Sequence, residues 1–133
     1  MRNYFSVQLK DDDIHAISSI GLAHLGDAVY ELLVRSYLCA HGKATGKGMH
    51  RATIEMVCAP AQAKYAEKIL GELTEEEQEV FRRGRNANVR SVPHNATRAE
   101  YQAATALESL FGWLYLHQRK ERINELFCRM MEE

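Results

Sequence analysis

Cysteine and proline are scarce in this chain, and their scarcity excludes several kinds of protein. The 133 residues include three cysteines, two prolines and eight glycines. Cys39, Cys58 and Cys128 are odd in number, widely spaced and embedded in apolar patterns, which argues against a disulfide framework or a zinc site. We therefore expect reduced core thiols in a cytoplasmic protein. So few prolines suit a helical chain.

Long apolar runs are also missing. No segment approaches the roughly 20 uncharged apolar residues that a membrane helix needs. Residues 1–13 lack the apolar core of a signal peptide and end in three aspartates. The composition, with 46% apolar and 26% charged residues, is that of an ordinary globular protein. The sequence therefore predicts one domain, residues 1–133, with no membrane span and no appended domain.

A net charge of −1 excludes a polycation, but the charges are unevenly distributed. No acidic residue occurs from Leu32 to Ile54 or from Arg82 to Arg98, and five arginines fall in the second stretch. Basic segments can bind a polyanion where they converge in space, and otherwise they form solvated loops and helix faces. The sequence leaves both interpretations open.

The spacing of apolar residues and capping residues predicts helices almost throughout and requires no strand. Ser18 or Ser19 can begin the first helix, and Pro60 fits the first turn of the third. Two Thr-x-x-Glu sequences, at 74–77 and 97–100, have capping-box spacing. We expect an all-α fold with helices at 18/19–40, 49–58, 60–70, 75–83, 97–117 and 119–131. Gly84 is expected to end the fourth of these helices, and loops are expected at 43–48 and 84–96.

The most informative segment is 25–29, Leu-Gly-Asp-Ala-Val, within the first expected helix. Apolar residues recur around it at helical spacing, so this helix must bury one face. A carboxylate at the edge of a packed surface is costly unless a cation meets it. We therefore interpret Asp27 as a candidate metal ligand, with a helix cap or a structural ion pair as the open alternative.

A second carboxylate, Glu108, lies between two leucines on the apolar face of the helix expected at 97–117. Two carboxylates from separate helices can hold a divalent cation, because Mg²⁺ prefers hard oxygen ligands. Such a cation can polarise a phosphodiester and generate hydroxide from bound water. The alternative is that Glu108 pairs with a cation such as Arg35. Glu31, one turn after Asp27, either extends the acidic pair or itself pairs with Arg35.

Three segments, in their order and spacing, resemble one known family. Segment 25–29 is similar to the signature of ribonuclease III catalytic domains, and 106–116 is similar to the second acidic helix of that family. Segment 82–87, Arg-Arg-Gly-Arg-Asn-Ala, resembles the Mini-ribonuclease III branch, which lacks a double-stranded-RNA-binding domain. The resemblance runs from about residue 20 to residue 126 and implies a ribonuclease III-type helical endonuclease domain.

The resemblance also implies a homodimer that places two metal-dependent centres in a valley for double-stranded RNA. Asp27 and Glu108 match the catalytic, metal-coordinating acids of the family, with Mg²⁺ as the expected ion and Mn²⁺ as its substitute. Larger members have further acids where this chain has Ala23 and Thr105, and another that aligns near Pro60, with Gln62 close by. With fewer carboxylate ligands, water or substrate would fill more of the metal shell.

Duplex RNA presents two rows of phosphates beside a shallow minor groove, so cations on a concave surface suit it better than base-reading side chains. The expected RNA contacts share the end of one helix and the loop that follows: Arg82, Arg83, Arg85, Asn86, Arg90 and Arg98.

The function expected from this resemblance is cytoplasmic, Mg²⁺-dependent cleavage of double-stranded RNA. The branch implies a precursor of large-subunit (23S) ribosomal RNA as the substrate, presented by its own folding or by a ribosomal protein. One alternative is a catalytically silent RNA-binding or scaffold module on the same fold. Another is an interaction protein unrelated to RNA, in which Asp27 forms a structural ion pair.

Overall fold

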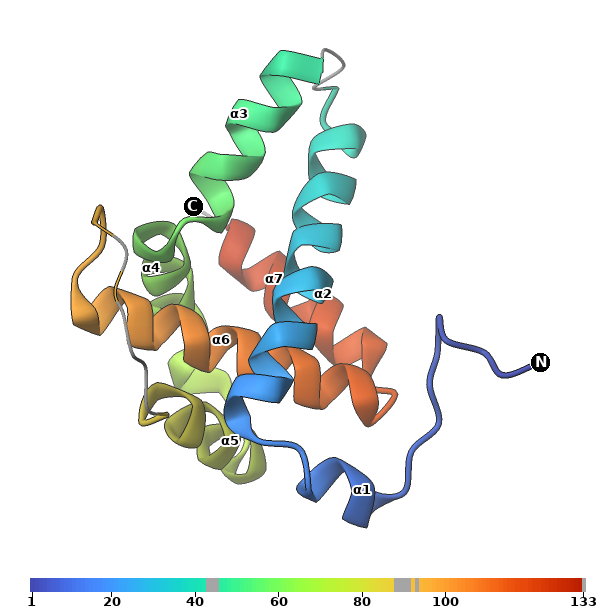
Figure 1. The fold of residues 1–133 in the computed structure, drawn as a ribbon. Coiled ribbons are helices and arrows are strands. Elements are labelled where there is room, and N and C mark those ends of the chain that lie inside the picture. The colour runs from blue at the N-terminus through green and yellow to red at the C-terminus, as the bar shows by residue number, and fades with distance from the viewer. Residues whose placement is uncertain (43–45, 88–91, 93, 133) are drawn as a thin grey trace.

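The structure is a computed structural model that describes residues 1–42, 46–87, 92 and 94–132. This part of the chain is helical and contains no strand, which confirms the all-α prediction (Figure 1). None of its helices is both long and apolar enough to cross a membrane. The elements are α1 (Asp11–His15), α2 (Ser19–Ala40), α3 (Gly46–Val57), α4 (Ala59–Ile69), the 3₁₀ turn η1 (Leu70–Glu72), α5 (Glu75–Arg85), α6 (Arg98–Leu116) and α7 (Lys120–Met131).

Local side chains explain where three of these helices begin. Ser18 Oγ accepts a hydrogen bond from the backbone amide of Gly21 at 3.0 Å, which caps α2. Both Thr-x-x-Glu sequences, at 74–77 and 97–100, form complete capping boxes at the starts of α5 and α6. Each cap satisfies amides that have no acceptor within the helix. The predicted starts of α2, α5 and α6 are therefore confirmed.

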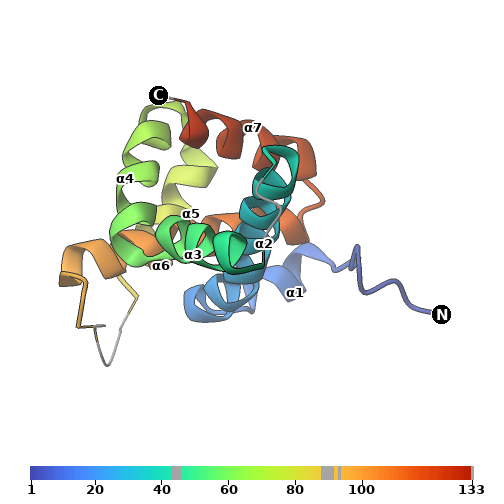
Figure 2. The ribbon, with the colours of Figure 1, turned by 90° about the horizontal axis from the view of Figure 1, so that it is seen from above.

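The central element is α6, and α2, α4, α5 and α7 all pack against it (Figures 1 and 2). Leu107, Leu110 and Leu114 of α6 are completely buried, as the predicted apolar face requires. Tyr30 of α2 meets Phe111 edge-to-face, with ring centroids 6.0 Å apart. α2 and α3 form a helical hairpin that extends beyond α6 (Figure 1), and Val34 and Leu38 in the second half of α2 still belong to the buried core.

Two helix boundaries differ from the prediction by more than one residue. The first turn of α3 begins at Gly46, three residues before the predicted start at Met49, because glycine has low helix propensity and conceals that turn. The prediction that Gly84 ends its helix was wrong, since α5 continues through it. A Cβ at Gly84 would lie 2.9 Å from Ala106 Cα and 2.7 Å from Ser109 Oγ. Gly84 thus lets α5 approach α6 closely, and tertiary packing overrides its local propensity.

The cysteines are not core residues, so that prediction was also wrong. Cys39 and Cys128 are exposed and Cys58 is intermediate in burial, and all three are free thiols. Cys39 directly follows buried Leu38, and Cys128 directly follows buried Phe127. Successive residues of a helix point about 100° apart, so a residue next to a core position can face solvent.

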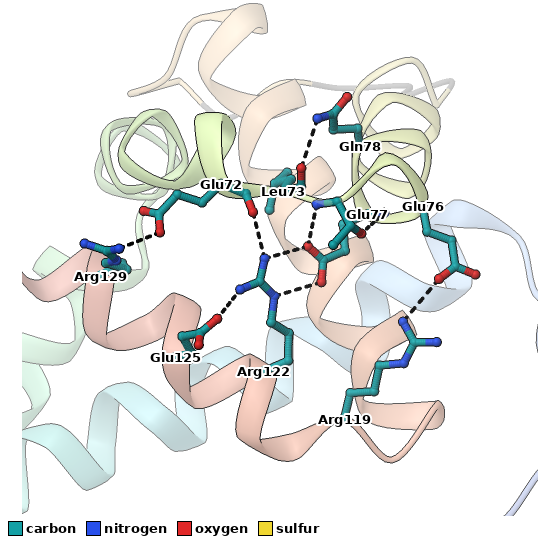
Figure 3. Close-up of polar contacts among 10 residues, drawn as sticks. Glu72, Leu73, Glu76, Glu77, Gln78, Arg119, Arg122, Glu125 and Arg129 are labelled. Atoms are coloured by element: carbon teal, nitrogen blue, oxygen red, sulfur yellow. Dashed lines mark hydrogen bonds and ion pairs between the residues drawn. The ribbon is translucent and has the colours of Figure 1, made fainter.

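A buried ion pair joins α5 to α7 (Figure 3). Glu77 is 2% exposed and accepts hydrogen bonds from Nε and Nη2 of Arg122 at 2.9 and 2.8 Å. Arg122 Nη2 also donates to the carbonyl of Glu72 at 2.8 Å. Burial opposes ionisation of Glu77, but the hydrogen bonds and charge of Arg122, with the Thr74 amide, outweigh it and lower its pKa. This network holds the start of α5 and the end of η1 on α7.

Candidate active site

Asp27 and Glu108 meet where α2 crosses α6. Asp27 lies exposed on α2, Glu108 lies partly buried on α6, and their carboxyl groups are in hydrogen-bonding contact. The two candidate acids, which lie far apart in the sequence, are therefore brought together by the fold.

Two helical glycines make this crossing close. A Cβ at Gly26 would lie 1.6 Å from the Glu108 carbonyl oxygen and 2.7 Å from the Gly112 nitrogen. A Cβ at Gly112 would lie 2.1 Å from the Leu22 carbonyl oxygen. Cβ contacts in real proteins essentially never fall below 3.0 Å, so a side chain at either glycine would separate the two backbones. Backbone contact at these glycines sets how closely Asp27 approaches Glu108.

The two carboxyl groups of Asp27 and Glu108 form a negatively charged site that favours a bound proton or cation. Burial and the negative charge of Asp27 raise the pKa of Glu108 to about 8, from an ordinary value of 4.5, while a hydrogen bond from Gln62 opposes the rise. Within the described residues, neither carboxylate forms an ion pair with lysine or arginine. Arg35 pairs with Glu31 at 2.8 Å, so it does not serve as the structural partner of Glu108. Either a shared proton or a bound cation can relieve the repulsion.

Gln62 of α4 is a third polar side chain at this pair, and it is 2% exposed. Its Nε2 donates to Glu108 Oε2 at 3.2 Å and to the Val57 carbonyl at 2.8 Å. Its Oε1 is buried and has no hydrogen-bond partner among the described residues. Sequence spacing does not reveal this contact, since it joins α4 to α6. The only signal in the sequence was a glutamine two positions after Pro60 at a helix start, and its burial became visible in the structure.

These groups fit a hard divalent cation. The carboxylates of Asp27 and Glu108 are oxygen ligands of the kind that Mg²⁺ and Mn²⁺ accept, and the amide of Gln62 lies directly beside Glu108. The described residues contain no group of three or more His, Cys, Asp or Glu that could hold a metal ion. Ala23 and Thr105, the two positions at which the resemblance implied further acids, are both buried and offer no carboxylate.

The arginines predicted to contact RNA begin on the last turn of α5. Arg82 and Arg83 are exposed, and both pair with Glu79, at 2.7 and 3.0 Å. Gly84, between them and the end of the helix, packs on Ser109 of α6. This close approach brings the basic turn of α5 to the part of α6 that carries the acidic site.

The remaining predicted contacts follow in the chain. Arg85 and Asn86 are exposed at the end of α5, and Arg98 is exposed at the start of α6. Arg90 lies outside the described residues. The fold thus presents basic side chains at both helix ends that flank residues 86–97.

Comparison with known proteins agrees with this architecture. The ribonuclease III domain family matches residues 21–119. A Mini-ribonuclease 3 from Enterococcus faecalis is 42% identical over 116 residues, which cover 86% of this chain and 88% of that protein. A Mini-ribonuclease 3 from Symbiobacterium thermophilum is 45% identical over 105 residues, covering 79% and 81%. A crystal structure of a protein from Fusobacterium nucleatum is 32% identical, with a TM-score of 0.83 over 91% of this chain and 98% of that one.

An all-helical fold that matches the ribonuclease III domain over most of its length defines a class of endoribonucleases. The chain belongs to the ribonuclease III family, in the branch of the Mini-ribonuclease 3 proteins. The resemblance carried by segments 25–29, 82–87 and 106–116 is thereby confirmed.

Proposed function

We propose that this endoribonuclease cleaves double-stranded RNA with the help of a divalent cation held by Asp27 and Glu108. The contact of these two carboxyl groups at the glycine crossing of α2 and α6 carries the proposal. Family membership supplies the reaction class, and the site supplies two oxygen ligands beside an exposed surface.

Each side chain has a part in the proposed chemistry. A bound Mg²⁺, or Mn²⁺ in its place, supplies Lewis-acid chemistry for hydrolysis of a phosphodiester. Glu108, partly buried on α6, would hold the cation as a carboxylate. Asp27, exposed on α2, would be the second carboxylate that holds it.

The proposed RNA surface is formed by Arg82, Arg83, Arg85, Asn86, Arg90 and Arg98. Arginine suits it because its planar fork can bind a phosphate through two parallel hydrogen bonds. Phosphate can also displace Glu79 from Arg82 and Arg83, since surface ion pairs of this kind are weak. Binding through phosphates is strongly salt-dependent and carries little sequence information.

The proposed assembly is a homodimer, in which two sites face opposite strands of one duplex. An apolar strip on α2 supports it: Leu25, Ala28, Val29 and Leu32 follow helical spacing and are exposed or intermediate in burial. The proposed natural substrate is a precursor of 23S ribosomal RNA in the cytoplasm, which rests on the family branch.

The test is cleavage of a long duplex RNA by the wild type, Asp27→Asn and Glu108→Gln, with Mg²⁺, with Mn²⁺ and with a chelator. We expect each substitution to lower the single-turnover rate by at least about 100-fold while duplex binding persists. Glu31→Gln is the matched control, because it removes a partly buried acid one turn from Asp27 that is already paired with Arg35. It should cleave like the wild type.

Retained cleavage in both site variants would reject the assignment of the two acids. Binding of duplex without cleavage by the wild type, under either cation, would instead favour the silent RNA-binding module. Ala23 and Thr105 favour that alternative, because they lack the carboxylates that the resemblance implies at these two positions.

A further inference from the structure

Gln62 occupies a buried position from which it reaches two elements at once. The amide nitrogen carries two hydrogens, and both are used: one on the Val57 carbonyl and one on Glu108 Oε2. Val57 ends α3, and its carbonyl has no acceptor role within that helix. The preceding carbonyl, of Met56, accepts a hydrogen bond from Tyr30 at 2.7 Å. Side chains of α2 and α4 thus hold the end of α3, and Gln62 extends this connection to the acidic site.

Capping of the Val57 carbonyl uses only one hydrogen of this amide and leaves the contact with Glu108 and the state of the amide oxygen to be explained. The oxygen of Gln62 is buried without a partner among the described residues, and such an atom costs about 1–3 kcal/mol. The side chain is also 2% exposed, so it gains nothing from water. A buried amide that carries this energetic cost beside a carboxylate indicates that Gln62 has a functional role at Glu108.

We propose that Gln62 is a positioning residue of the metal centre: its amide hydrogen bond holds Glu108 Oε2 and leaves the other carboxylate oxygen to face Asp27 and the cation. This inference rests on the proposed function. The contact acts by donation, so the nitrogen of Gln62 matters and not its oxygen. A glutamate at this position offers no donor to Glu108 or to Val57, and it brings a like charge to Glu108.

The experiment measures Mn²⁺ binding to the free protein, without RNA, from the electron paramagnetic resonance signal of unbound Mn²⁺. The variants are Gln62→Met, which keeps the volume, and Gln62→Glu, which keeps an oxygen but removes the donor. We expect each to bind Mn²⁺ about 10-fold or more weakly than the wild type. Duplex cleavage should lose kcat by a similar factor, while KM for the duplex stays within about twofold.

Two controls separate positioning from a general loss of structure. Gln78→Met removes an amide that donates to the Leu73 carbonyl at 3.0 Å on α5, and it should leave Mn²⁺ affinity unchanged. In a double-mutant cycle, Gln62→Met should weaken Mn²⁺ binding much less when Glu108 is already Gln, because the two residues act through one contact. Circular dichroism identifies a variant that does not fold, and Gln62→Asn, too short to reach both acceptors, then takes its place with the same expectation.

Wild-type Mn²⁺ affinity in Gln62→Met, or in Gln62→Asn where it takes its place, would overturn the inference. Unchanged or tighter binding by Gln62→Glu would also overturn it, since the oxygen would then be a direct ligand. Equal losses with and without Glu108 would assign Gln62 a structural role instead. Absence of Mn²⁺ binding and of cleavage in the wild type would reject the proposed function itself, which distinguishes that failure from one confined to Gln62.

Discussion

Gly26 and Gly112 are the residues on which the geometry of the acidic site depends. Glycine inside a helix costs about 1 kcal/mol relative to alanine, because the unfolded chain has more freedom to lose. Here that cost is offset by backbone contact between α2 and α6, which no other residue permits. The same contact places Asp27, next to Gly26, against Glu108. Stability and site geometry are therefore linked at one crossing.

We expect Gly26→Ala to lower the free energy of unfolding by about 3 kcal/mol and to abolish cleavage. The added Cβ would lie 1.6 Å from the Glu108 carbonyl oxygen, so the helices must separate and the carboxylates move apart. Gly71→Ala is the matched control, because a Cβ there meets nothing within 4 Å. Urea unfolding followed by circular dichroism measures both, and the control should stay within about 0.5 kcal/mol of wild type. Equal stability of Gly26→Ala and wild type would show that α2 and α6 are not held this closely.

The elements of this fold differ in how far their own sequence determines them. The caps of α2, α5 and α6 are local, so the residues that form them also reveal them. The role of Gly84 could not be predicted in this way, because it depends on Ala106 and Ser109 of another helix. The contact of Gln62 with Glu108 is of the same kind. Sequence patterns predicted the six longer helices, without α1 and η1, and singled out the two acids as candidates, but close approach between elements required the structure.

The ion pair of Glu77 with Arg122 joins α5 to α7, and its loss should lower the stability of the fold (Figure 3). We expect Arg122→Leu to lower the free energy of unfolding at pH 7 by about 2 kcal/mol. Removing one partner of a fully buried pair costs roughly 3–5 kcal/mol, and the Arg122 side chain is 23% exposed, so water reduces the effect. Arg129→Leu is the control, because its pair with Glu72 at 2.8 Å is more exposed and should contribute less than about 1 kcal/mol.

The same pair makes stability depend on pH with a definite sign. The pKa of Glu77 is lowered in the folded protein, so its contribution is complete above the ordinary glutamate pKa of 4.5 and is lost as the pH falls through the lowered value. We therefore expect the stability difference between wild type and Arg122→Leu to shrink below about pH 4. Urea unfolding at a series of pH values measures this difference. A constant difference down to acid pH would contradict the assigned charge on Glu77.

In the whole molecule, α2 contributes residues to two different surfaces. One side packs on α6 and carries the glycine crossing. The apolar strip of Leu25, Ala28, Val29 and Leu32 borders the core, with Leu25 and Val29 packed against its edge and Ala28 and Leu32 exposed. Leu32 is 58% exposed and borders an apolar cavity of about 180 Å³, lined also by Phe5 of the N-terminal arm. Because Asp27 lies on the same helix as this strip, a second copy seated there would fix one acidic site relative to the other.

We expect Leu32→Glu to weaken self-association by at least about 100-fold, because a carboxylate buried in an apolar interface costs several kcal/mol. Sedimentation at micromolar concentration should show a dimer for the wild type and a monomer for the variant. Ile54→Glu is the matched control, since Ile54 is 51% exposed on α3 and lies outside the strip.

The Leu32→Glu monomer should still bind Mn²⁺, because the contact of Asp27 with Glu108 lies within one chain. Its cleavage of duplex RNA should fall, because one duplex would then meet one site at a time. A monomeric wild type, or equal association by both variants, would place any partner surface elsewhere on the molecule.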